Sequence, residues 1–427
     1  MKNPVSFHGS GKDYFKIWIV NMILTICTLG LFSPWSKVRS RNYLYSKTEV
    51  AGEQFEYHAT PMQILQGRLM MILGIAFIAG LFYLSPQIGL MVAALMYLGV
   101  PWLVHKNAQF NASVTSYNWV RFRFTGSLKD SYKVFLLRPV IATAVVTAVY
   151  WLLSLAILPS SGMVNPFLSV PVFIFSAITA VMMLSWVVAG ISDYMLSGRS
   201  YGKLNFTARL SSSFFFTTYF AAAMISLSSI ALSLLMLGAS LRVSVETGSA
   251  LELLAVKGQL LYDFMFPGTF AALEVKHYLV YALFFITGAC IHGFIRGRIY
   301  NHMMNHTFIG SKKAFALSAD LNAAHYVWII ATNHMMTLFS LGLARPFCVV
   351  RMMRYMADCT YVKGDIAILN EHEHDERKDR VFAEEHEKML KAQQLTVAPT
   401  DLAAYTRKKQ TASVAATTQK GRQIGIS

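Results

Sequence analysis

Eight long apolar segments dominate this sequence, and each is close to the length of about 20 residues that a helix needs to cross a bilayer. They lie at residues 15–33, 67–84, 88–104, 134–158, 168–191, 214–238, 277–295 and 325–344. Charged residues make up only 14% of the chain, which is too few to cover a soluble surface at this length. The sequence therefore predicts an all-α polytopic membrane protein with six to eight transmembrane segments in the lipid bilayer.

Lys and Arg are unevenly distributed over the linkers between these segments. Sixteen of them lie in one set of linkers, at 34–66, 105–133, 192–213 and 296–324. Only three lie in the other set, at 85–87, 159–167 and 239–276. The positive-inside rule places the first set in the cytoplasm, so the six middle segments alternate across the membrane. Basic cytoplasmic loops also account for the formal net charge of +16, and no nucleic-acid partner is needed to explain it.

The two ends of the apolar region match each other. Residues 14–52 align with residues 326–364 without a gap. Polar residues, glycines and prolines are prominent among the identical positions. The identical pairs include Asn21/Asn333, Thr25/Thr337, Gly30/Gly342, Pro34/Pro346 and Arg39/Arg351. Shared hydrophobicity does not explain identities of this kind, so we expect an internal repeat. A second match, of residues 7–16 with 124–133 in a cytoplasmic linker, predicts a cytoplasmic N-terminus.

Each cytoplasmic linker also contains a short run in which apolar and polar residues alternate. The four runs are QFEY at 54–57, RFRF at 121–124, LNFT at 204–207 and AFAL at 314–317. Alternation with a period of two indicates short β-strands or hairpins. Strands this short are not stable alone, so we expect these hairpin-like linkers to pack together beneath the membrane helices.

The stretch YFKIWIVNMILTICTLGLFSPWSKVRSRNY and its second copy TNHMMTLFSLGLARPF resemble the YjgN-like family of bacterial inner-membrane proteins. The resemblance extends from about Phe7 to Gly364. The second copy departs from the first in having Ala344 and Arg345 where the first has Phe32 and Ser33. The resemblance implies a bacterial inner (cytoplasmic) membrane location with several passes, and it supplies no reaction and no catalytic residues.

The two outer segments are the strongest candidates for a functional site. A polar amide at membrane depth must face protein or water, and a Gly followed by Pro weakens helix continuity. The predicted pathway or packing residues are Asn21, Thr25, Gly30 and Pro34 in the first segment and Asn333, Thr337, Gly342 and Pro346 in the last. Arg39 and Arg351 are predicted to anchor the helix ends at the cytoplasmic interface.

Two arrangements of these outer segments remain open. They are either re-entrant elements that begin and end in the cytoplasm around a central pathway, or two ordinary spanning helices whose small and polar residues serve packing. Two functions follow. One is a transporter or channel for a small solute, and the other is a non-transporting scaffold that binds a protein partner through its hairpins and tail.

Other candidate sites carry less weight. His302 and His306 lie four residues apart, but no third ligand accompanies them, and a polar interfacial helix explains them better than a metal site. His292 and His334 lie in or near apolar segments and are read as packed histidines. The acidic run EHEHDE at 371–376 is read as a solvated surface. We therefore predict no metal and no cofactor. The chain contains no P-loop and no nucleophile-elbow motif, so an enzyme remains unsupported.

The predicted organisation has three parts. A polytopic membrane domain covers residues 1–364 and includes the repeat units 14–52 and 326–364. Residues 365–395 are rich in charge and are predicted to form a cytoplasmic helix. Residues 396–427 turn to Ala, Thr, Gln and basic residues, and are predicted to form a disordered basic tail in the cytoplasm.

Overall fold

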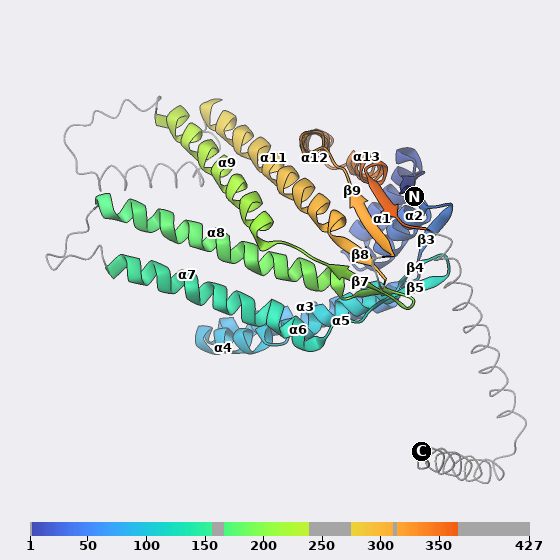
Figure 1. Ribbon diagram of the computed structural model, residues 1–427, viewed down its shortest axis with the longest axis horizontal. Helices are drawn as coiled ribbons and strands as arrows, with labels where there is room; N and C mark the ends of the chain where they lie inside the picture. The colour runs from blue at the N-terminus through green and yellow to red at the C-terminus, as the bar shows by residue number, and fades with distance from the viewer. Residues whose placement is uncertain (1, 156–165, 239–274, 311–313, 366–427) are drawn as a thin grey trace, which may run out of the picture. The chain divides into compact units, whose positions relative to one another are not determined.

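The computed structural model describes residues 2–155, 166–238, 275–310 and 314–365 (Figure 1). The predicted charged helix and basic tail beyond residue 365 lie outside the described residues, as does the acidic run at 371–376. The helices are α1 (Gly11–Cys27), α2 (Ser33–Ser46), α3 (Pro61–Leu84), α4 (Pro86–Tyr97), α5 (Val100–Ser113), α6 (Leu128–Tyr132), the π turn η1 (Lys133–Leu137), α7 (Arg138–Leu155), α8 (Pro166–Ser197), α9 (Ser212–Gly238), α11 (Val275–Asn305), α12 (Ala323–Phe339) and α13 (Arg345–Asp358).

Short strands between the helices form a closed antiparallel barrel, in the order β1-β10-β9-β8-β7-β6-β5-β4-β3-β2. They are β1 (Lys2–Phe7), β2 (Thr48–Val50), β3 (Glu53–Tyr57), β4 (Thr115–Tyr117), β5 (Val120–Phe124), β6 (Arg199–Tyr201), β7 (Leu204–Ala208), β8 (Thr307–Ile309), β9 (Phe315–Ala319) and β10 (Thr360–Lys363). The strands expected from the alternating runs are therefore present. The fold is mostly helical, as expected, and the hairpins do pack together, but they close into one ten-stranded barrel that the all-α classification did not include.

Closure of the barrel explains how such short strands persist. Strands of three to six residues have too few ladder bonds to be stable alone, and an open edge invites pairing with other chains. Here β1 pairs with β10, so the first strand of the chain lies beside the last strand described. A tight turn joins β2 to β3 through Ala51 and Gly52, both at positive φ, as a two-residue hairpin requires.

Five junctions between strand and helix share one backbone hydrogen bond. In each, the first residue after a strand donates its N–H to the carbonyl of the residue just before the neighbouring strand. The five bonds are His8 to Lys47, His58 to Val114, Thr125 to Gly198, Arg209 to His306 and Asp320 to Cys359, with N···O distances of 2.7 to 3.1 Å. The barrel is thus built from five equivalent junctions, each of which starts a helix.

At four of these junctions, a side chain on the helix that returns to the barrel forms hydrogen bonds with the backbone just before the helix that leaves the barrel. The Tyr43 hydroxyl accepts from the Ser10 N–H at 2.8 Å and donates to the Ser10 carbonyl at 3.0 Å. Tyr355 makes the same two bonds to Asn322, at 3.1 and 3.2 Å. Tyr194 donates to the Ser127 carbonyl at 3.3 Å, and the Ser211 N–H donates to His302 Nε2 at 3.2 Å. These contacts fix where each helix leaves the barrel.

Tyr355→Phe is expected to lower the free energy of unfolding by about 1 kcal/mol, because two backbone groups at the start of α12 lose their partner. Burial raises the pKa of Tyr355 to about 12, so its hydroxyl keeps a proton to donate at neutral pH. Thermal denaturation in detergent measures the change. Tyr83→Phe is the matched control. Because Tyr83 is 92% exposed, the loss of its hydroxyl should leave the melting temperature unchanged. Equal melting temperatures for both variants would contradict the stabilising role of the Tyr355 hydrogen bonds.

Five described helices are long and apolar enough to cross a membrane, at Pro61–Leu84, Leu128–Leu155, Pro171–Ser197, Ser212–Ser233 and Tyr278–Asn305. The pair α4 and α5, bent by 45°, makes a sixth if it counts as one span. The prediction of six to eight segments therefore holds only at its lower limit. Helices α7, α8, α9 and α11 run side by side away from the strands (Figure 1), and their apolar surfaces are largely exposed, as expected of helices that face lipid.

The outer pairs α1–α2 and α12–α13 both leave the barrel and return to it. Helix α1 follows β1 and α2 leads into β2, and these two strands pair so that Phe7 lies opposite Thr48. Helix α12 follows β9 and α13 leads into β10, with Ala319 opposite Thr360. At 17 residues each, α1 and α12 are also shorter than the spanning helices. Both ends of each pair therefore lie at the barrel, as the re-entrant alternative expects, and the position of the pairs in the bilayer stays a prediction.

Candidate functional site

The turns at the tips of the two outer pairs have the same geometry. Leu29 and Gly30 have φ of 50° and 92°, and Leu341 and Gly342 have 51° and 91°. In both turns the glycine N–H donates to the carbonyl of Thr25 or Thr337 at 2.7 Å. Each glycine supplies the left-handed conformation that ends the helix. The prolines that follow stand near the start of the next helix, where a missing N–H costs nothing.

The two buried asparagines of these pairs have different surroundings. Asn333 donates to the Cys348 carbonyl at 3.3 Å and accepts from Arg351 at 3.3 Å. Asn21 is 1% exposed, and neither its amide nitrogen nor its oxygen has a hydrogen-bond partner. Arg39 lies over the ring of Phe32, 5.4 Å from its centroid, and makes no contact equivalent to that of Arg351. No hydrogen bond among the described residues joins Asn21 to Asn333, and their shared lining of a pathway stays a prediction.

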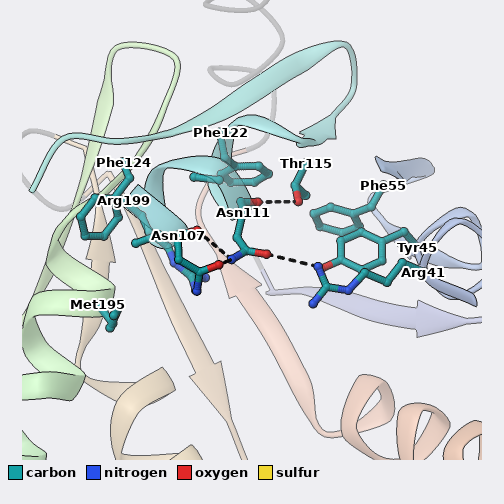
Figure 2. Close-up of a pocket in the computed structure, with 12 residues that line it drawn as sticks. Arg41, Tyr45, Phe55, Asn107, Asn111, Thr115, Phe122, Phe124, Met195 and Arg199 are labelled. Atoms are coloured by element: carbon teal, nitrogen blue, oxygen red, sulfur yellow. Dashed lines mark hydrogen bonds between the residues drawn. The ribbon is translucent and has the colours of Figure 1, made fainter. Parts of the chain in front are cut away.

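A cavity of about 470 Å³ lies elsewhere, where the barrel meets α2, α5 and α8 (Figure 2). The strands contribute Phe55, Thr115, Phe122, Phe124 and Arg199, which share one face of the sheet. The helices contribute Arg41, Tyr45, Asn107, Ala108, Asn111, Ala112 and Met195. None of the residues predicted from the outer segments lines this cavity.

Polar side chains cross the cavity wall as a connected chain (Figure 2). Arg41 donates to Asn111 Oδ1 at 3.3 Å, and Asn111 Nδ2 donates to Asn107 Oδ1 at 2.9 Å. Arg41 also donates to the Tyr57 hydroxyl at 3.1 Å and lies over that ring. All these partners are neutral, so the guanidinium is held in place while its charge stays uncompensated.

Arg199 supplies a second guanidinium on another side of the cavity (Figure 2). Burial among protein atoms lowers its pKa, yet its side chain keeps accessible surface because it borders the open volume. Within the described ranges, no ion pair joins Arg41 or Arg199 to a carboxylate, and no described lining residue carries one. Two positive charges therefore share a partly desolvated space without an acidic partner.

Further basic groups surround this part of α2. Burial lowers the pKa of Lys37, and the neighbouring charges of Arg41 and Arg68 lower it further. Arg68 on α3 also contacts the hydroxyl of Ser33. The positive potential around the cavity therefore extends beyond the two arginines that line it, and a small anion would be attracted from solution.

Aromatic rings cover the same face of the sheet. Phe55 contacts Tyr117 with 5.0 Å between ring centroids, and Phe122 contacts Tyr201 at 5.2 Å. Tyr117 and Tyr201 lie 6.0 Å apart, which joins the two pairs. Positively charged guanidiniums beside an apolar, aromatic wall suit a small organic anion that has one charged end and one apolar end.

Sequence reasoning missed this cavity, although one signal was available. Three of the four hairpins begin with a threonine, at Thr48, Thr115 and Thr307, and Thr360 begins β10 in the same way. The hydroxyls of these four threonines each donate to the carbonyl four residues earlier, at 2.6 to 3.1 Å. Arg199 stands at the fifth equivalent position. It is the residue that departs from the common structural pattern.

The histidines take structural positions. His302 stacks on Phe214 at 4.1 Å and accepts the Ser211 N–H, and His306 Nδ1 lies 2.8 Å from the His302 carbonyl. The rings of His292 and His334 lie 6.3 Å apart in an edge contact. The described residues contain no group of three or more His, Cys, Asp or Glu side chains that could hold a metal.

Comparison with known proteins places the chain in a family. It is 24% identical over 396 residues to "Inner membrane protein YjgN" of Escherichia coli (strain K12), covering 88% of this chain and 92% of that protein. The protein of the same name from Salmonella typhimurium is 23% identical over 376 residues, covering 84% and 88%. No solved structure matches significantly. A family profile described as "Bacterial protein of unknown function (DUF898)" matches residues 2–389, so the chain belongs to this family of bacterial proteins.

Proposed function

We propose that this protein is a multi-pass protein of the bacterial inner membrane that binds a small anionic solute and carries it across the bilayer. The observation behind this proposal is the cavity of about 470 Å³ in which Arg41 and Arg199 have no carboxylate partner. Uncompensated charges in a desolvated space are costly, and an anionic ligand would remove that cost. Guanidinium groups suit carboxylate and phosphate because they can form paired hydrogen bonds with both.

The position of the cavity supports transport over simple binding. Two of its walls are α5 and α8, which belong to the bent pair α4–α5 and to one of the apolar spans. The Lys and Arg count favours a cytoplasmic position for the barrel, and a bound anion would then lie at the cytoplasmic end of these helices.

Ligand binding to the purified full-length protein tests the proposal first. We expect phosphate or a small carboxylate such as succinate to raise the melting temperature, since a ligand at 100 times its Kd stabilises by about 2.7 kcal/mol. Choline, as a cation of similar size, should have no effect. The same anions should move into proteoliposomes that contain the protein and not into empty liposomes. If neither the anions nor choline raises the melting temperature, and the proteoliposomes take up no anion, the proposal is contradicted and a non-transporting scaffold is favoured.

A further inference from the structure

A second hollow, of about 640 Å³, lies between η1, α7 and α8 and is separate from the arginine cavity. At the barrel end its walls are polar, with Ser127, Asp130, Lys133, Asp193 and Ser197 among the lining residues. Further along α7 and α8 it meets an apolar groove of about 540 Å³, and Ile141 and Trp186 line both spaces. The apolar groove continues past Val145, Met182, Met183 and Phe216. Two neighbouring hollows therefore share the wall formed by Ile141 and Trp186, and one is lined by charged side chains while the other is apolar.

Arg138 provides the cation of the charged hollow. Its guanidinium donates to the Trp186 carbonyl at 3.2 Å and lies 4.9 Å from the centroid of that ring. Gly190 leaves room for it, because any side chain there would overlap the guanidinium. Within the described chain no carboxylate forms an ion pair with Arg138.

A π turn brings the cations of this wall together. The Arg138 N–H bonds to the Lys133 carbonyl five residues earlier, instead of four as in an α-helix. Residues five apart in an α-helix point about 140° away from each other, because each residue turns the helix by about 100°. The wider π turn moves Lys133 and Arg138 onto the same side, and both line the hollow.

Asp193 provides the anion of this hollow, and the charge of Arg138 acts on its carboxylate although the two groups form no ion pair within 4 Å. It is half-buried on α8, and among the described residues its carboxylate accepts one hydrogen bond, from the Ser197 hydroxyl at 3.5 Å. Lys133 is already paired with Asp130 at 3.1 Å. This leaves one cation, Arg138, and one anion, Asp193, each without a charged partner within 4 Å in the part of the chain that the structure describes.

We propose that these two hollows together bind one phospholipid whose headgroup carries a phosphate and a primary amine. The phosphate lies against Arg138, the ammonium group against Asp193, and an acyl chain follows the groove past Ile141, Val145 and Met183. A zwitterionic headgroup matches both charges, whereas a purely anionic headgroup would leave Asp193 facing a like charge. The helices α7, α8 and α9 around these hollows are apolar spans, so a lipid can enter sideways from the bilayer.

Native mass spectrometry of the delipidated full-length protein, after addition of single lipids, tests this assignment. We expect one phosphatidylethanolamine to be retained at least tenfold better than phosphatidylglycerol, which has no amine. Retention of phosphatidylethanolamine should also exceed retention of phosphatidylcholine, whose quaternary amine cannot donate a hydrogen bond to Asp193. Free phosphoethanolamine should fail to compete, because it lacks the acyl chain. Equal retention of the three lipids, or full competition by free phosphoethanolamine, would overturn the proposal.

Variants of the two charged residues locate the site. Asp193→Asn keeps the size of the side chain and is expected to abolish the preference for phosphatidylethanolamine over phosphatidylcholine. Arg138→Gln should reduce retention of both lipids at least tenfold. Lys129→Gln is the matched control, since Lys129 is an exposed cation close by that does not line the hollow. Unchanged lipid preference in a folded Asp193→Asn protein would overturn the assignment even where Arg138→Gln fails to fold.

Discussion

Replacing Arg199 by glutamine is expected to weaken anion binding about 10- to 100-fold. A hydrogen bond between charged groups contributes roughly 1.5–3 kcal/mol, and each 1.4 kcal/mol is a factor of ten in Kd. Arg41→Gln should have a comparable effect, because Arg41 is the other guanidinium in the cavity. Titration of phosphate or succinate, followed by calorimetry or by the melting temperature, measures the loss.

The same substitution should stabilise the protein when no ligand is present. Arg199 has no acidic partner among the described residues, and burial among protein atoms disfavours its charged form, so a neutral glutamine should cost the ligand-free protein no stability. Opposite effects on stability and on binding are typical of a ligand site and would not arise from general damage to the barrel. The ligand-free melting temperature of Arg199→Gln should therefore be equal to or higher than that of the wild type.

Arg123→Gln is the matched control for Arg199→Gln. Arg123 lies opposite Ser200, next to Arg199 in the register of β5 and β6, but its side chain points to the other face of the sheet. It is exposed and does not line the cavity. Equal losses of binding in Arg123→Gln and Arg199→Gln would mean that the anion responds to overall charge and not to this cavity.

Asn21→Leu and Asn333→Leu are expected to change stability in opposite directions. Leucine has the same branched shape as asparagine but no polar atoms, and Asn21 is buried with both polar atoms unpaired, so its replacement should stabilise by about 1–3 kcal/mol. Asn333→Leu removes the oxygen that accepts from Arg351 and the amide that donates to the Cys348 carbonyl. It should therefore destabilise by a similar amount. Thermal denaturation of both variants in the same detergent gives the comparison.

Flux through the same two variants tests the pathway predicted from the sequence. If Asn21 and Asn333 line that pathway, both variants should lose solute uptake while their insertion into the membrane stays normal. If the asparagines serve packing, uptake should follow stability, and Asn21→Leu should transport as well as the wild type. Normal uptake in both variants would remove the asparagines from the transport site and leave the arginine cavity as the candidate.

The sequence predicted the local features of this fold well. Apolar runs of spanning length became the long helices, because membrane helices satisfy their own backbone groups and depend little on distant residues. Alternating runs such as RFRF at 121–124 became strands, because a period of two puts apolar residues on one face. The turns at Gly30 and Gly342 also occur where a glycine followed by a proline indicated a break.

Closure of the barrel could not be predicted from any one run. It depends on pairing between β1 and β10, which are more than 350 residues apart, and no local pattern records that distance. The arginine cavity depends on it as well. Arg41 on α2, Asn111 on α5 and Arg199 on β6 come together only because the barrel orders the hairpins around it.

The sequence by itself therefore determined that this chain enters a membrane, which segments are helical, and where short strands interrupt them. These properties follow from composition and periodicity over fewer than about 30 residues. Only the tertiary structure decided that the strands close into a barrel, that α1–α2 and α12–α13 return to it, and that two arginines share a cavity without a carboxylate. Whether a charged side chain has an ion-pair partner depends on its neighbours in space, and those neighbours are often distant in the sequence.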